Sequence, residues 1–200
     1  MMYPVGTWKA GAPHSNWPPG LAEAVGAVLL GYVRLEESMF LFFMEYLKTP
    51  ARATNYLFSA LHNRDRIDLL RSLVEAHAKT DTEREAVLFA LKCYDICTEN
   101  RNFLAHAHFK KVTPEGLLFL KLASDKSGTL KPYVGSLESI RDLADSMSHT
   151  FEYVGLIWGS VRYTAGFGAA PGAPDWPLPE RPPQPRKLNW SPPLANPEGA

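Results

Sequence analysis

The distribution of proline divides this 200-residue chain into three zones and limits where long helices can form. Four of the 17 prolines lie in residues 1–20, three in residues 21–163 and ten in residues 171–200. Proline lacks a backbone N–H and disrupts helix interiors, so only the middle zone is suited to long helices. We therefore expect a folded domain over residues 21–163, an N-terminal arm over residues 1–20 and a proline-rich tail over residues 164–200.

The two flanking zones hold four of the five tryptophans, which are Trp8, Trp17, Trp176 and Trp190. An exposed indole ring forgoes burial free energy, and this favours flanks that dock on the domain or on a partner. The ten prolines of residues 171–200 favour instead a polyproline-like tail that is disordered in isolation. We expect the disordered tail and keep docking as the alternative.

Apolar residues recur three and four positions apart over residues 21–47, which is typical of one buried face of a long helix. Thr49-Pro50 interrupts this pattern, because threonine suits a helix cap and proline suits a first helical turn. A second helical segment then runs to about residue 78. The polar run Asn63-Arg64-Asp65 predicts a bend within it.

The run Thr82-Glu83-Arg84-Glu85 matches a capping box, in which a hydroxyl and a carboxylate three residues apart bind the free backbone donors of a helix start. A third helix is expected to begin there and to end with the run Arg101-Asn102-Phe103-Leu104-Ala105-His106. A last long helix is expected over about residues 136–163, where apolar residues again follow helical spacing.

Between these two helices the apolar pattern alternates, which predicts short strands at Phe109–Val112 and Leu117–Ala123, joined by Thr113-Pro114-Glu115-Gly116. We interpret residues 109–133 as a small β-hairpin insertion. The predicted fold class is thus mainly all-α: an up-down helical bundle of four to five helices with a β-hairpin before the last long helix.

Charge and composition restrict the classes of partner. Lysine plus arginine number 21 and aspartate plus glutamate number 21, so no overall positive field gathers nucleic acid or anionic lipid. No segment of about 18 uninterrupted apolar residues predicts a membrane span, and the start Met1-Met2-Tyr3-Pro4 has no basic region followed by an apolar stretch that would indicate a signal peptide. We expect a cytoplasmic protein without membrane contact.

The only cysteines, Cys93 and Cys97, lie four residues apart in one predicted helix. A disulfide at that spacing would be strained, so reduced thiols packed in the core are expected. The alternative is a metal site completed by His106 and His108, but zinc sites usually have more closely spaced cysteines.

Arg101, Asn102 and His106 are polar side chains that can share one rim at the end of the third helix. Arginine supplies a planar, permanent cation that binds phosphate oxygens, histidine can exchange a proton near neutral pH, and asparagine can orient either group. An alternative without function pairs Arg101 with Glu99 and lets His106 cap the helix C-terminus.

The pattern Arg101-Asn102-x3-His106 resembles the Arg-x4-6-His motif of the HEPN superfamily, in the variant with asparagine after the arginine. The order of elements over residues 21–163 is also similar, with this motif at the end of the third helical segment. The resemblance implies a homodimer in which two copies of Arg101 and His106 share one cleft. It further implies metal-independent RNA cleavage that leaves a 2′,3′-cyclic phosphate and needs no cofactor.

The resemblance carries biological expectations as well. A HEPN-type endoribonuclease can be a toxin or a phage-defence effector, controlled by an antitoxin or another regulatory protein, and a structured RNA such as tRNA would need only a local cleft. Many HEPN proteins are not catalytic, so a silent binding or dimerisation module is the alternative.

Four further residues are candidates around the motif. Glu36 lies on the apolar face of the first helix and needs a partner there. It orients Arg101 or His106, or it forms a structural pair with Arg66 or Arg71. His108, Lys110 and Lys111 form a basic cluster in which His108 and Lys110 are expected to face one way, as an RNA-binding rim or as a solvated strand face.

Overall fold

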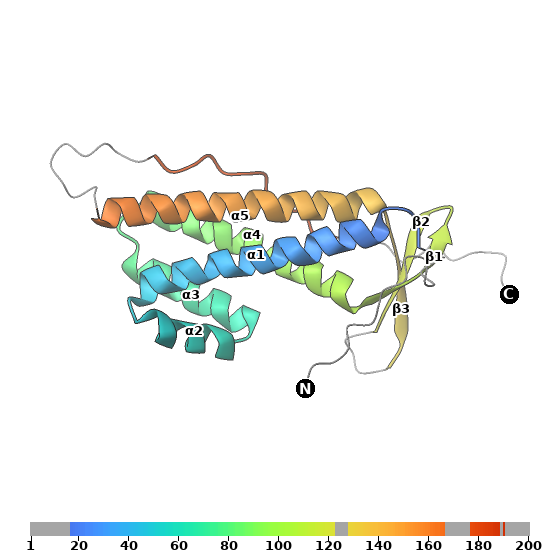
Figure 1. Ribbon diagram of the computed structural model, residues 1–200, viewed down its shortest axis with the longest axis horizontal. Coiled ribbons are helices and arrows are strands. Elements are labelled where there is room, and N and C mark those ends of the chain that lie inside the picture. Colours follow the sequence, from blue (N-terminus) through green and yellow to red (C-terminus); the bar gives the residue numbers. More distant parts are fainter. Residues whose placement is uncertain (1–16, 123–127, 167–176, 189, 191–200) are drawn as a thin grey trace, which may run out of the picture.

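The computed structural model describes residues 17–122, 128–166, 177–188 and 190 of the chain. Its elements in chain order are α1 (Leu21–Leu47), α2 (Ala51–Ala60), α3 (Asn63–His77), α4 (Asp81–His106), β1 (Ala107–Thr113), β2 (Gly116–Leu122), β3 (Leu130–Gly135) and α5 (Leu137–Gly166). The fold is mainly helical, as the sequence predicts, and successive helices run in alternating directions (Figure 1).

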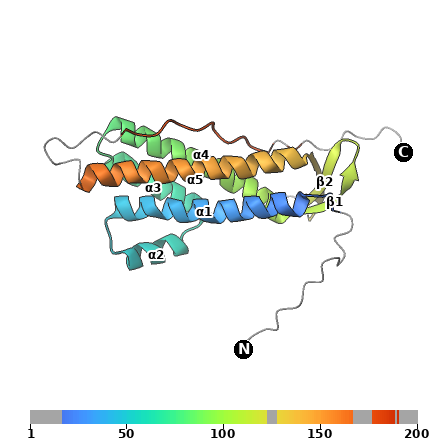
Figure 2. The ribbon, with the colours of Figure 1, turned by 45° about the horizontal axis from the view of Figure 1, so that its top comes forward.

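Three long helices, α1, α4 and α5, lie side by side along the molecule (Figures 1 and 2). The most extensive packing is between α1 and α5, and α4 packs against both. The shorter helices α2 and α3 lie beside one end of this trio, and the sheet lies at the other end (Figure 1). The end of α4 that carries the 101–106 run is therefore the end next to the sheet.

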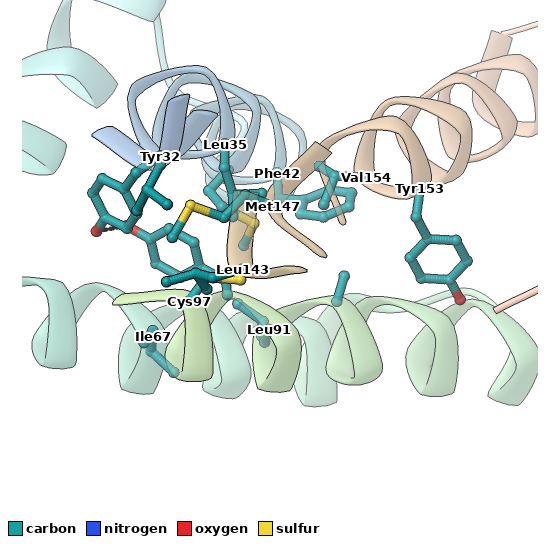
Figure 3. Close-up of a cluster of buried hydrophobic side chains, with 14 of the residues drawn as sticks. Tyr32, Leu35, Phe42, Ile67, Leu91, Cys97, Leu143, Met147, Tyr153 and Val154 are labelled. Carbon is teal, nitrogen blue, oxygen red and sulfur yellow. Dashed lines mark hydrogen bonds between the residues drawn. The ribbon is translucent and has the colours of Figure 1, made fainter. Parts of the chain in front are cut away.

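The core forms where the apolar faces of the three long helices meet. Leu35 and Phe42 of α1, Leu91 and Cys97 of α4, and Met147 of α5 are buried there (Figure 3). The full set of buried residues recurs every three or four positions along each of these helices, so each helix buries one stripe. The predicted helix 21–47 is confirmed residue for residue, and the last helix extends three residues beyond the predicted end.

The start of α4 corrects the predicted capping box by two residues. Thr80, not Thr82, is the N-cap, and its Oγ1 accepts a hydrogen bond from the Glu83 N–H at 3.0 Å. The Glu83 carboxylate in turn accepts hydrogen bonds from the Lys79 N–H and from the Tyr46 hydroxyl. Both registers contain a threonine followed by a glutamate three residues later, and the contact with Tyr46 of α1 favours the earlier one.

The bend in the second helical segment also lies earlier than predicted. The helix breaks at Leu61 and His62, both in extended backbone conformations, and residues 63–65 form the first turn of α3. The prediction of a broken helix is confirmed, and only the position of the break is wrong.

The predicted hairpin is part of a three-stranded antiparallel sheet with the order β1-β2-β3. The predicted insertion contains two strands and not β3, and Pro132 in the middle of β3 would disfavour it inside a sheet. Proline is tolerated in a strand at the edge of a sheet, and β3 is such an edge. A third strand also gives the insertion the stability that an isolated hairpin lacks.

Residues 177–188 and 190, which we name the C-terminal strap, run back along the bundle next to α4 and α5 (Figure 2). Their contacts with the bundle include hydrogen bonds to Asn100, an ion pair to Glu85 and burial of Trp190. The expected disordered tail is therefore wrong for these residues, and docking is correct. Residues 1–16, 167–176, 189 and 191–200 lie outside the described residues, including Trp8 and Trp176.

None of the helices in the described part of the chain has the length and apolarity that a bilayer crossing would require. Cys93 and Cys97 lie on the core face of α4 as free thiols, and both are fully buried. Burial raises the pKa of Cys93 to about 11, and burial followed by the nearby Cys93 raises the pKa of Cys97 to about 12.

We predict that neither thiol reacts with a disulfide reagent in the native protein at about pH 8. Only the thiolate reacts, and both the raised pKa values and the burial suppress it. Ellman's reagent should detect no thiol in the native chain and both thiols after unfolding in guanidinium chloride. Rapid native labelling of either cysteine would contradict the described packing of α4.

Candidate functional site

The candidate site lies at the end of α4 that joins the sheet, and we call residues 99–106 the motif end of α4. No loop follows this end, because α4 stops at His106 and β1 begins at Ala107. Leu104 is buried and anchors the last turn in the core. The run is thus presented on a packed helix end, as the sequence indicates.

Arg101 leans across to the neighbouring helix α1. Its guanidinium carbon lies 4.0 Å from the centre of the Tyr32 ring, in a cation–π arrangement. The Nε of Arg101 is buried and has no hydrogen-bond partner. A buried donor without an acceptor is unusual in a folded protein and needs an explanation. The stacking therefore fixes the guanidinium plane without saturating its donors.

The hydroxyl of Tyr32 is the centre of a buried polar network that joins three helices. It lies 3.1 Å from the Tyr94 hydroxyl and 3.2 Å from Thr98 Oγ1 of α4, and it accepts a hydrogen bond from Asn63 Nδ2 of α3 at 2.7 Å. Burial, and then Tyr32, raises the pKa of Tyr94 far above its usual range, so Tyr94 stays a neutral phenol. The ring beneath Arg101 is consequently held in one position.

The carboxylates expected near Arg101 are engaged elsewhere. Glu36 pairs with Arg66 of α3, which also donates to Asn63 Oδ1 at 3.0 Å. The alternative in which Glu36 forms a structural pair with Arg66 is confirmed. Glu36 is connected to Tyr32 only indirectly, through hydrogen bonds from Arg66 to Asn63 and from Asn63 to Tyr32. Glu99 pairs with Lys187 of the strap at 2.6 Å, so the expected pairing of Arg101 with Glu99 is wrong. No carboxylate of the described residues pairs with Arg101.

Asn102 and His106 are four residues apart and lie on the same side of α4, and Arg101 lies about 100° round the helix from Asn102. Asn102 is half-buried and lines a pocket of about 470 Å³ between α3 and α4. His106 is exposed and forms no hydrogen bond or ion pair within the described part of the chain. The structure therefore presents the three motif residues at one helix end, with Arg101 and Asn102 half-buried and His106 exposed.

The basic cluster after the motif has a different orientation from the one predicted. The pairing register of β1 shifts between Phe109 and Lys111, where Lys110 is the extra residue of a β-bulge. His108 pairs with Leu120 and Lys111 with Leu118, so His108 and Lys111 share the outer face of the sheet. The prediction that Lys110 shares a face with His108 is wrong, because the bulge places Lys111 on that face instead. The alternation of apolar and polar residues does not reveal a bulge.

An apolar surface adjoins the motif end of α4. Helix α3 reaches α1 and α4 at Asn63, which contacts Tyr32, so α2 and α3 leave the sheet-side ends of α1 and α4 uncovered (Figure 1). On α1, Leu29 and Val33 are exposed beside Tyr32, and Leu30 is exposed behind them. We call these three residues the α1 patch.

Sequence reasoning missed Asn100, which precedes Arg101. Asn100 is only 3% exposed, and its side chain donates to the Arg186 carbonyl at 2.8 Å and accepts from the Leu188 N–H at 2.9 Å. No sequence signal identifies this contact, because the partners are backbone groups more than 80 residues away along the chain. Tyr32 was predicted only as an apolar position of the first helix.

A second pocket, of about 510 Å³, lies between α5 and the strap and is lined by none of the predicted site residues. His149 and Arg186 are among its lining residues. Over the described ranges, no group of three or more histidine, cysteine, aspartate or glutamate side chains is placed to hold a metal ion. Of the predicted site residues, Asn102 lines the pocket between α3 and α4.

The chain matches no protein-family model, and no curated protein and no solved structure is significantly similar to it. The function must therefore be argued from the residues at the motif end of α4.

Proposed function

We propose that the chain is a HEPN-type endoribonuclease that cleaves RNA without a metal ion and acts as a homodimer. One observation carries this proposal: Arg101 has no carboxylate partner among the described residues, while His106, five residues later at the same helix end, is exposed. A structural arginine usually satisfies its donors with a carboxylate or with carbonyl oxygens. An arginine that is fixed by stacking and has no carboxylate partner is instead suited to an anion that reaches its terminal nitrogens from outside.

A phosphate diester is an anion that fits these donors. Guanidinium binds phosphate oxygens in a planar fork, and this geometry requires the guanidinium plane to be held. The Tyr32 ring holds it, and the Tyr94, Thr98 and Asn63 contacts hold the ring. The guanidinium is therefore already oriented in the folded protein, and substrate binding does not have to supply the free energy for orienting it.

Cleavage by transesterification needs one base and one acid. The base removes the proton of the 2′-hydroxyl, whose oxygen then attacks the adjacent phosphorus, and the acid protonates the leaving 5′-oxygen. The products are a 2′,3′-cyclic phosphate and a 5′-hydroxyl. One chain supplies one exposed His106, so we propose that the second histidine comes from the second copy of the chain.

The other residues then have supporting roles. Arg101 stabilises the charge that develops on the phosphorane-like transition state, and Asn102 positions the histidine or the phosphate. His108 and Lys111, which share the outer face of the sheet, provide a basic rim after the motif for neighbouring phosphates, and Lys110 at the bulge adds a third basic residue. The total charge of zero favours a compact RNA target such as a tRNA loop over a long single strand. A toxin or phage-defence effector, restrained by an antitoxin or other regulator, is the biological role that goes with this chemistry.

A second candidate function is a non-catalytic dimerisation module of the same HEPN-like bundle. The α1 patch favours it, since Leu29 and Val33 lie beside Tyr32 without cover. In this alternative the motif residues Arg101, Asn102 and His106 only build the contact surface between two copies and have no chemical role.

We predict that the purified protein cleaves RNA in the presence of EDTA and that His106→Ala reduces the rate by about 10²- to 10⁴-fold. Arg101→Ala should reduce it by about 10²- to 10³-fold, because an oriented charge donor is lost. Denaturing gels give the rates, and mass spectrometry of the product ends should find the cyclic phosphate.

The matched control is His77→Ala, which removes an exposed histidine at the end of α3 and should leave the rate unchanged. Equal cleavage by wild type, His106→Ala and Arg101→Ala would refute the proposal. Absence of any cleavage, together with loss of the dimer in His106→Ala, would establish the dimerisation module instead.

We also predict that the chain is a dimer in light scattering and that Val33→Lys converts it to a monomer. We propose that two copies meet through their α1 patches, which adjoin the motif end of α4. A lysine at position 33 would bury an unpaired charge in that contact. Leu156→Lys on α5 is the control, because Leu156 is about equally exposed but lies away from the motif end of α4. A monomeric wild type, or a Val33→Lys dimer as stable as the wild type, would contradict this pairing.

A further inference from the structure

The last part of the C-terminal strap contacts three residues of the motif end of α4, namely Glu99, Asn100 and Phe103. Asn100 makes two hydrogen bonds to the strap backbone, one to the Arg186 carbonyl and one from the Leu188 N–H. Glu99 pairs with Lys187. The Asn100 side chain thus binds the strap as a neighbouring strand would, with one donor and one acceptor.

Trp190 completes this contact from the side of the sheet. Its ring packs edge-on against Phe103, with the ring centres 5.0 Å apart, and stacks on Phe119 of β2 at 4.6 Å. Its Nε1–H donates to Ser139 Oγ at 3.2 Å. Phe103 lies two residues after Arg101, so the indole packs directly against the motif itself.

The fit around Trp190 has no room for adjustment at Gly135. A Cβ added to Gly135 would overlap the indole ring. While Trp190 is docked, this position in β3 therefore accepts only glycine. The strap, the sheet and α4 therefore meet at a single closely packed point. By contrast, the other end of the strap contacts α4 through Arg181, which pairs with Glu85 and lies over Phe89, far from the motif.

We infer that the C-terminal strap holds the motif end of α4 in place, with Asn100 and Trp190 as positioning residues for Arg101 and His106. The last turn of a helix lacks part of its hydrogen bonds and frays unless other groups pack against it. Here Tyr32 covers one side of the turn and the strap covers another. The effect on catalysis rests on the proposed function, but the mechanical part of this inference does not.

The alternative is that the strap only adds general stability. The two cases differ in where the protein opens. A positioning strap protects residues 99–106 against local opening, whereas a general stabiliser raises the free energy of global unfolding and protects all helices equally.

Hydrogen–deuterium exchange of the full chain tests this inference. Trp190→Ala should increase exchange in peptides covering residues 99–106 by about tenfold, with no change in the middle of α1 and α5. Gly135→Ala should act in the same way although it leaves the strap sequence unchanged, because the added Cβ displaces the Trp190 indole. Trp190→Phe retains a ring and should restore most of the protection. Arg181→Ala, at the far end of the strap, should leave residues 99–106 as protected as in the wild type.

Unchanged exchange at residues 99–106 in both Trp190→Ala and Gly135→Ala would overturn the inference, and so would a uniform increase over all helices. The readout is independent of RNA cleavage, so a failure of the proposed function is separately visible as an inactive wild type. If the wild type does cleave RNA, Trp190→Ala should lower kcat more than it raises KM, since positioning residues act on the reacting geometry.

Discussion

The Tyr32 hydroxyl, buried at the junction of α1, α3 and α4, is the contact on which the candidate site depends. A buried phenol must find partners, and Tyr32 has three, contributed by Tyr94, Thr98 and Asn63. These contacts fix the ring, and the ring in turn carries the guanidinium of Arg101. If the hydroxyl lost its partners, the ring and the arginine above it would both be free to rotate. The orientation of Arg101 is therefore a property of three helices and not of α4 alone.

The motif end of α4 is also held from a second direction, by the C-terminal strap. Asn100 binds the strap backbone and Phe103 packs against Trp190, so the residues on either side of Arg101 are fixed by different elements. This arrangement leaves His106, the last residue of α4, exposed on a rigid support. A rigid support with exposed polar groups is the requirement for an acid–base site, since misplacement by about 1 Å can cost about a hundredfold in rate. It serves a contact surface equally well, which is why the dimerisation module remains the second candidate.

The long helices could be predicted from the sequence because each buries one regular stripe, as α1 does from Leu21 to Tyr46. The elements that could not be predicted depend on contacts between distant residues. Pro132 argues against a strand at β3 unless the position of β3 at the edge of the sheet is known. The bulge at Lys110 becomes apparent only from the pairing of β1 with β2. The strap is bound through Asn100, which belongs to no sequence motif that would predict this contact. Arg101, Asn102 and His106 were identified as candidates, but the stacking on Tyr32 and the engagement of Glu36 by Arg66 needed the structure.

The central claim is that two copies of the chain complete one reaction site, because a single copy presents one Arg101 and one His106. Subunit mixing tests it most directly: wild type and His106→Ala are unfolded together, refolded in varying ratios, and assayed for RNA cleavage at constant total protein. With a shared site only wild-type pairs are active, so an equal mixture should retain about a quarter of the wild-type activity. Activity in direct proportion to the wild-type fraction, or a wild type that cleaves no RNA, would contradict the account.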